Sequence, residues 1–279
     1  MRIAVTGASG RLGGQVAELL AGEPGHEVVA LARPSSTYVP PPGVTVAAAD
    51  YADPVTLRKA LTGADTLVFV SSDGHAATVM LHHANVVQAA ADAGVGHVVA
   101  LSGLDVDLES PFCYAVTNGH TEQLLAASGC GYSLARASVY TEFFAALVRG
   151  SRRGDAAGGE VRLPAGDARV SLVARADVGR SLAALALRPP SNTHHDLTGP
   201  AALSLAEVVA ALDPAARYVD VPPAEYVAAL LDGGETSWWA HAYATTLESI
   251  RLGRWAAVSD EVAALTGRPA ASLHDLSEG

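Results

Sequence analysis

A glycine-rich turn between an apolar segment and a helical one constrains this chain more than any other feature. Residues 2–6 are expected to form a short apolar strand, and apolar side chains then recur at helical spacing. At the first strand-to-helix turn of a dinucleotide-binding fold, glycines permit the tight turn, admit a pyrophosphate and let the helix pack on the strand. The helix N-terminus then offers free N–H groups to the phosphates. The turn predicts cofactor contacts from Gly7, Ser9, Gly10, Arg11, Leu12 and Gly13.

The segments around this turn favour a dinucleotide site over a turn that is merely tight. Strands and helices alternate through the first half of the chain, and the strands carry Val and Leu on both faces. This pattern is typical of a parallel sheet covered by helices on both sides. The predicted fold class is α/β, a Rossmann-like doubly wound parallel sheet with a smaller C-terminal substrate-binding lobe. Strands are expected at 2–6, 27–31, 44–48, 66–70, 97–101 and 132–135, and helices at 12–20, 53–61, around 83–90 and at 121–127.

The second half is less regular and predicts the lobe. A Gly/Arg-rich loop is expected at 151–159 and a helix at 177–187. Ser204 and Glu207 form a capping-box pattern ahead of an apolar run, whereas the tail at 235–252 is expected to be irregular. The predicted division assigns 1–148 to an NAD(P)-binding domain to which 168–188 return, and 189–279 to a substrate-binding lobe to which 149–167 contribute.

Charge and composition narrow the classes of partner. The net charge is −11, from 29 acidic and 18 basic residues, and such a field repels nucleic acid and anionic membranes. No apolar run approaches the ~18 residues that cross a bilayer. Two cysteines exclude a disulfide scaffold and fit a reducing cytoplasm. We expect a cytoplasmic monomer or homodimer that binds a small molecule. No metal site is expected, because the histidine pairs are adjacent in sequence and not at the spacing that places two imidazoles on one helical face.

The end of the second strand predicts which dinucleotide is bound. NAD usually needs a carboxylate there for the ribose hydroxyls, whereas NADP needs a cation for the 2′-phosphate. Residues 28–49 contain no acidic side chain, and Arg33 follows the strand with Ser35 and Ser36 close behind. An arginine fork matches a phosphate, and the serine hydroxyls can donate to it. A solvated surface arginine is the alternative, and the predicted cofactor is NADP(H).

Several short motifs together resemble one family. They are the TGxxGxxG form of Thr6–Gly13, the run Asp50–Asp53, the pair Ser71–Ser72, and further short segments that continue to residue 269. This set, which spans almost the whole chain, is similar to the NmrA-like branch of the atypical short-chain dehydrogenases/reductases. That branch includes NAD(P)H:quinone oxidoreductases and some polyketide-tailoring ketoreductases.

The resemblance also implies where parts of the cofactor lie. Asp50 and Tyr51 would border the adenine, and Ser71 and Ser72 would lie along the cofactor. The stretch 136–140, which includes Ala137 and Ser138, would lie by the nicotinamide.

The chain departs from this resemblance at the catalytic pair. The wider superfamily implies a Tyr-xxx-Lys pair, in which the lysine lowers the pKa of the tyrosine, with a serine nearby. Here Tyr114 is followed four positions later by Asn118, and the only lysine, Lys59, lies on the helix before the fourth strand. Ser102 keeps the serine position. Tyr114 is either a proton donor or an aromatic loop residue, and both interpretations stay open.

Without that pair, the substrate has to tolerate the charge that hydride transfer creates. An ordinary ketone gives a strongly basic alkoxide, whereas a quinone gives a phenolate-like oxygen whose conjugate acid lies near the ~10 of tyrosine. A quinone or a phenol-flanked aromatic ketone is therefore favoured, and aromatic side chains would supply stacking area. The expected substrate contacts, for each of which core packing is the alternative, are Val139, Tyr140, Phe143, Phe144 and Trp238.

The sequence thus predicts an NADPH-dependent reductase that transfers hydride to a carbonyl of a quinone or an aromatic polyketide-type ketone, without the usual Tyr-Lys dyad. The competing hypothesis is a catalytically silent NADP(H)-sensing regulatory protein, which the broken dyad favours. An isomerase that keeps NADP bound is a third interpretation.

Overall fold

The computed structural model describes residues 1–155 and 158–277. Its central sheet consists of seven parallel strands: β1 (Arg2–Val5), β2 (Glu27–Ala32), β3 (Val44–Ala48), β4 (Thr66–Phe69), β5 (His97–Gly103), β6 (Gly131–Ala137) and β10 (His194–Leu197). Their order is β10-β6-β5-β4-β1-β2-β3. The chain leaves β3 at one edge and returns to pair β4 with β1, so the topological switch lies between β1 and β4. Doubly wound folds bind ligands at such a switch, beyond the carboxyl ends of the strands. The predicted fold class is confirmed.

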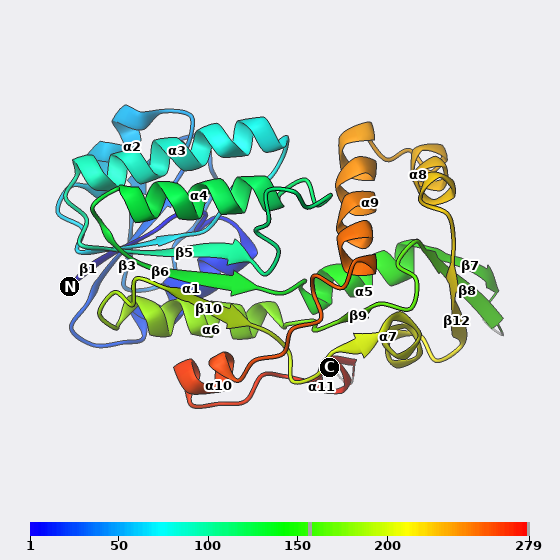
Figure 1. Cartoon of the computed structure of the whole chain (residues 1–279). Helices are drawn as coiled ribbons and strands as arrows, with labels where there is room; N and C mark the ends of the chain where they lie inside the picture. The colour runs from blue at the N-terminus through cyan, green and yellow to red at the C-terminus, as the bar shows by residue number, and fades with distance from the viewer. Residues whose placement is uncertain (156–157, 278–279) are drawn as a thin grey trace.

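Helices cover both faces of this sheet (Figure 1). One face carries α2 (Pro54–Leu61), α3 (Ala76–Asp92) and α4 (Ala115–Ala127), and the other carries α1 (Arg11–Ala21) and α6 (Arg175–Ala186). Burial on both faces explains why the central strands β1, β2, β4 and β5 are mostly apolar rather than alternating. Among the helices of the described residues, none combines the length and the apolar run that a membrane span requires.

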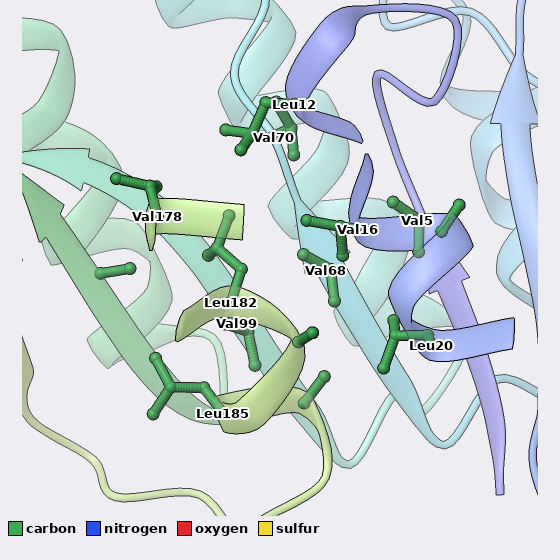
Figure 2. Packing of buried hydrophobic residues seen from close by; sticks show 14 of the residues in the cluster. Val5, Leu12, Val16, Leu20, Val68, Val70, Val99, Val178, Leu182 and Leu185 are labelled. Atoms are coloured by element: carbon green, nitrogen blue, oxygen red, sulfur yellow. The ribbon is translucent and has the colours of Figure 1, made fainter. Parts of the chain in front are cut away.

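Figure 2 shows the apolar layer between the central strands and the helices α1 and α6. Side chains of α1 and α6 pack there against the faces of the central strands and leave almost no exposed surface. This packing fixes the start of α1 relative to the end of β1. The labelled members of the cluster are Val5, Leu12, Val16, Leu20, Val68, Val70, Val99, Val178, Leu182 and Leu185.

The rest of the chain forms a smaller lobe and the segments that join it to the sheet, with these elements: α5 (Thr141–Gly150), β7 (Arg152–Asp155), β8 (Gly158–Leu163), β9 (Arg169–Val170), β11 (Leu203–Ser204), α7 (Leu205–Leu212), β12 (Ala216–Asp220), α8 (Pro223–Asp232), α9 (Ser237–Arg251), α10 (Glu261–Thr266) and α11 (Leu273–Ser277). Strand β8 pairs with β12 in parallel and with β7 antiparallel. A third apolar cluster joins α5, α7 and α9 to this small sheet.

Local sequence signals account for two helix starts. The Asp53 carboxylate accepts the N–H of Val55 over 3.0 Å, and Pro54 occupies the first position of α2. The predicted capping box is present at α7, where Ser204 and Glu207 bond each other's backbone N–H groups.

The structure corrects four expectations outside the site. Positions 151–159 contain β7 and the start of β8, paired antiparallel, instead of a loop, although 156–157 lie outside the described residues. The tail expected to be irregular is α9, and α4 begins at Ala115, six residues before the expected start at Thr121. β10, expected in the lobe, pairs with β6 in the central sheet, so the lobe boundary at residue 189 precedes a strand of the larger body. In each case long-range pairing or packing outweighs weak local propensity.

Candidate functional site

A cavity of about 450 Å³ opens beside the topological switch, at the carboxyl ends of β1, β2 and β4. The glycine-rich turn and the start of α1 form one wall of this cavity. Most of the predicted cofactor contacts line it, and their contact with a cofactor stays a prediction. The predicted residues found there are Gly7, Ser9, Gly10, Arg11, Leu12, Gly13, Arg33, Asp50, Tyr51, Ser71 and Ser72.

The glycine-rich turn has the conformation that an anion site requires. Gly7 lies in the left-handed region with φ 61°, which favours glycine, and its carbonyl accepts the Gly10 N–H over 2.9 Å. A Cβ added at Gly13 would lie 2.3 Å from the Gly7 carbonyl oxygen. Because Gly10 has no capping side chain, the first N–H groups of α1 remain available to a phosphate. These residues therefore fit the pyrophosphate of a dinucleotide.

The far end of the cavity carries Arg33, which follows β2 and is exposed. Within 1–155 and 158–277 no carboxylate pairs with Arg33, so its guanidinium is available to a phosphate group. Ser35 and Ser36 do not line the cavity, and the Ser36 hydroxyl instead accepts the N–H of Tyr38 over 3.2 Å. The structure therefore brings Arg33 into the site without the two serines.

Buried hydrogen bonds fix the wall between β1 and β4. The Tyr51 hydroxyl donates to the carbonyl of Val70 over 2.6 Å, and the Val70 N–H donates to the Thr6 hydroxyl oxygen over 2.9 Å. Burial raises the pKa of Tyr51, so its phenol stays protonated and keeps this bond. Tyr51 thus contributes an aromatic face to the cavity while its polar end is committed to the protein.

A second cavity, of about 490 Å³, lies between the sheet and the lobe and meets the first. Ser71, Ser72, Asp73 and Arg175 line both cavities, so the two cavities adjoin at these residues. Aromatic rings dominate the second cavity, and several contact one another: Trp239 stacks on Tyr243 with centroids 5.9 Å apart. The aromatic lining residues are Phe112, Tyr114, Tyr140, Phe143, Trp239, Tyr243 and Trp255.

The residues predicted near the nicotinamide and the substrate divide into two groups. Ala137, Ser138, Val139, Tyr140 and Phe143 line the second cavity. The expectation for Phe144 is wrong, because its side chain is fully buried in the lobe core and does not line the cavity.

The expectation for Trp238 also needs correction. Trp238 packs on His75 with ring centroids 4.6 Å apart and does not line the cavity, whereas Trp239 does. Successive helical residues point about 100° apart, so the face of α9 decides between them. The Thr236 cap, whose hydroxyl accepts the N–H of Trp239, is a sequence signal that would have revealed this helix.

The predicted active-site serine is engaged elsewhere. The Ser102 hydroxyl donates to Glu122 Oε1 over 2.7 Å, and both oxygens of Glu122 accept hydrogen bonds from the Arg136 guanidinium. Neither Ser102 nor Arg136 lines either cavity. The geometry therefore disfavours the predicted catalytic role of Ser102 and assigns it to an ion-paired cluster behind the cavity wall.

Tyr114 lines the second cavity, but no lysine accompanies it. Its hydroxyl donates to the Gly74 carbonyl over 2.5 Å, and burial, followed by the neighbouring Cys113, raises the pKa of its phenol. Asn118 lies one helical turn further along α4, and Lys59 is exposed on α2, outside both cavities. The conventional pair would lower the pKa of the tyrosine, so the environment of Tyr114 acts in the opposite direction.

Sequence reasoning missed Arg175, the one cation that lines the second cavity within the described residues. It begins α6, and its guanidinium carbon lies 5.4 Å from the ring centroid of Tyr140. Nη1 lies 3.9 Å from Glu142 Oε1, and the Arg175 N–H donates to the same carboxylate over 3.1 Å. Its position two residues before the expected helix at 177–187 was the only sequence signal.

Comparisons with known proteins agree with this geometry. Residues 7–189 match the sequence profile of a family described as NAD(P)H-binding. The chain belongs to this family. Quinone oxidoreductase 2 of Escherichia coli is 32% identical, covering 97% of this chain and 96% of that protein. An NAD(P)H azoreductase of Xenophilus azovorans is 30% identical, covering 99% and 96%.

A solved structure extends this family relationship to three dimensions. The NADPH-dependent quinone oxidoreductase of E. coli, crystallised with NADPH, is 28% identical with a TM-score of 0.88 and covers 99% of this chain and 98% of its own. The resemblance predicted from the sequence is therefore confirmed, and the likeness to this solved structure covers the elements that line both cavities.

Proposed function

We propose that this protein is an NADPH-dependent reductase that transfers hydride to a carbonyl of a quinone or an aromatic polyketide-type ketone. One observation carries the proposal: a cavity with a phosphate-compatible glycine turn adjoins an aromatic cavity at Ser71, Ser72, Asp73 and Arg175. The aromatic walls suit a flat acceptor. Relatives across nearly the whole chain are a quinone oxidoreductase and an azoreductase, which supports a reductase of conjugated acceptors.

NADPH, when bound, supplies the hydride. The glycine turn would hold its pyrophosphate and Arg33 its 2′-phosphate, which leaves the protein the task of stabilising an oxygen that gains charge. We assign that task to Arg175, because it is the cation of the aromatic cavity and needs no proton transfer to act. A quinone suits this arrangement, since its reduced oxygen is phenolate-like with a conjugate acid near ~10.

The experiment that tests the function is NADPH oxidation with a panel of acceptors. Quinones and polycyclic aromatic ketones should be reduced at least tenfold faster than aliphatic ketones, because general-acid assistance worth ~10²–10⁴ in rate is missing for the latter. Equal rates for aliphatic ketones would contradict the substrate class.

A silent NADP(H) sensor is the second candidate, and the missing lysine beside Tyr114 favours it. Tight NADPH binding without turnover across the whole panel, together with a protein partner recovered in a pull-down, would replace the reductase by the sensor.

Replacing Arg33 with alanine is expected to weaken NADPH binding by about 1–3 kcal/mol, the value of a lost hydrogen bond to a charged group, and to leave NADH binding nearly unchanged. The reason is that only NADPH carries the 2′-phosphate. Calorimetric titration with both nucleotides measures the difference. Arg58→Ala, on the exposed face of α2 outside both cavities, is the matched control. Equal losses for NADPH and NADH would remove Arg33 from the 2′-phosphate site.

A further inference from the structure

His83 lies beneath the junction of the two cavities and has no place in the chemistry above. It belongs to α3, is 1% exposed, and makes a T-shaped ring contact with Phe69, with centroids 4.9 Å apart. Both ring nitrogens have partners: Nε2 lies 2.7 Å from the hydroxyl oxygen of Ser71, and Nδ1 lies 2.7 Å from that of Thr121. Ser71 is one of the residues that line both cavities.

The hydrogen bonds of Thr121 determine which ring nitrogen of His83 carries the hydrogen. The Thr121 hydroxyl oxygen lies 2.7 Å from the Thr117 carbonyl, one helical turn back, and donates to it. If that hydrogen pointed to His83 instead, two oxygens would face each other at 2.7 Å without a hydrogen between them. Nδ1 is therefore the N–H, which donates to Thr121, and Nε2 is left as an acceptor.

With Nε2 as an acceptor, the hydroxyl hydrogen of Ser71 is already donated within the protein. Because Nε2 has only a lone pair, the Ser71 hydroxyl donates to it over 2.7 Å. Among the described residues, the Ser72 carbonyl, 3.0 Å from the same oxygen, is the other acceptor within reach of that hydrogen, and it also lies within the protein. In either orientation the Ser71 oxygen turns a lone pair toward the cavities. A hydrogen-bond donor fits there, and a phosphate or an oxyanion does not.

The donor and acceptor roles of the two His83 ring nitrogens are kept at physiological pH. Burial, and then the neighbouring His82 and His120, lower the pKa of His83 to about 4, so the ring stays neutral and Nε2 stays an acceptor.

We infer that His83 is a positioning residue that fixes Ser71 as an acceptor at the junction, and that Ser71 binds a donor of the nicotinamide half of the cofactor, either a ribose hydroxyl or the carboxamide N–H. The inference concerns how the cofactor of the proposed function is held. It does not depend on which acceptor is reduced, or on whether any acceptor is reduced.

Binding measurements on His83→Phe test this inference, since phenylalanine keeps a flat ring but cannot bond Ser71. We expect NADPH to bind about threefold to tenfold more weakly, the range for one hydrogen bond. Adenosine 2′,5′-bisphosphate, which lacks the nicotinamide half, should bind as before. His83→Gln, whose amide oxygen can accept the Ser71 hydrogen, should recover most of the loss. If His83 had a merely structural role, His83→Phe would weaken the binding of NADPH and of the bisphosphate alike, and that outcome would overturn the inference.

The chain offers a matched control in a second buried Ser–His pair. His97, at the start of β5 and outside both cavities, lies 2.9 Å from the Ser133 hydroxyl oxygen and is 4% exposed. His97→Phe removes a comparable buried hydrogen bond, so it should leave the ratio of NADPH to bisphosphate affinity unchanged. If it lowers that ratio as much as His83→Phe does, the effect is not specific to the junction and the inference falls.

A second arm identifies the donor. Ser71→Ala should weaken the binding of NADPH. The 3-acetylpyridine analogue of NADPH has no amide N–H, so its binding distinguishes the ribose hydroxyl from the carboxamide as the donor. If Ser71→Ala weakens the binding of the analogue as much as that of NADPH, the donor is the ribose hydroxyl. If the binding of the analogue is unaffected, the donor is the carboxamide. If neither nucleotide is weakened, the inference is overturned. Nitrogen-15 shifts of the His83 ring should show an Nδ1–H tautomer at neutral pH, and a doubly protonated ring would contradict it.

Discussion

Gly13→Ala is expected to abolish NADPH binding in the range where the parent protein saturates, and to destabilise the fold. The added methyl carbon would lie 2.3 Å from the Gly7 carbonyl oxygen, 2.5 Å from its carbon and 2.8 Å from the Thr6 carbonyl oxygen. All three atoms belong to the backbone, so no side chain can turn aside. The turn between β1 and α1 has to open, and the first N–H groups of α1, which we expect to hold the cofactor phosphates, move with it.

We expect the free energy of unfolding to fall by about 1–3 kcal/mol, the usual range for overpacking, and NADPH affinity to fall at least a hundredfold. Urea unfolding and calorimetric titration measure the two effects. Gly150→Ala is the matched control, because an added Cβ there, at the end of α5, meets nothing within 4 Å. Unchanged affinity in Gly13→Ala would mean that the glycine turn does not hold the cofactor.

Arg175→Gln is expected to lower kcat for quinone reduction by about 10²–10³, the cost of removing one oxyanion-stabilising donor, while NADPH binding changes little. The guanidinium is the cation that lines the aromatic cavity in the part of the chain that the structure describes. Tyr140 lies beneath it, and Glu142 lies beside it, which restrains its position. Glutamine keeps hydrogen-bonding groups but loses the charge.

Quinones whose reduced forms differ in pKa make this test specific. A more basic product oxygen needs more stabilisation, so the loss in Arg175→Gln should grow with the pKa of the hydroquinone. Arg175→Lys keeps the charge and should retain a larger part of kcat. If NADPH affinity falls instead while kcat is unchanged, Arg175 holds a cofactor phosphate and the charge-stabilising role is wrong.

Sequence predicted those parts of the fold that depend on nearby residues. Asp53 with Pro54 begins α2, and Ser204 with Glu207 begins α7, because a cap is satisfied within one helical turn. The same holds for the glycine turn, where each required backbone conformation is set by the residue itself. Segments whose structure depends on a distant partner were mispredicted, such as β10, which pairs with β6, and α9, which packs into the lobe core.

The site divides in the same way. The chain's own sequence predicted most of the first cavity: the glycine turn at Gly7–Gly13 and, after β2, the cation Arg33, although not that Ser35 and Ser36 lie outside it. Only the tertiary structure decided the lining of the aromatic cavity. It selected Phe143 over Phe144 and brought Arg175 to the cavity. The reason is physical: a turn is specified by the backbone freedom of adjacent residues, whereas a cavity wall depends on which face of each helix is buried by elements far away in the chain.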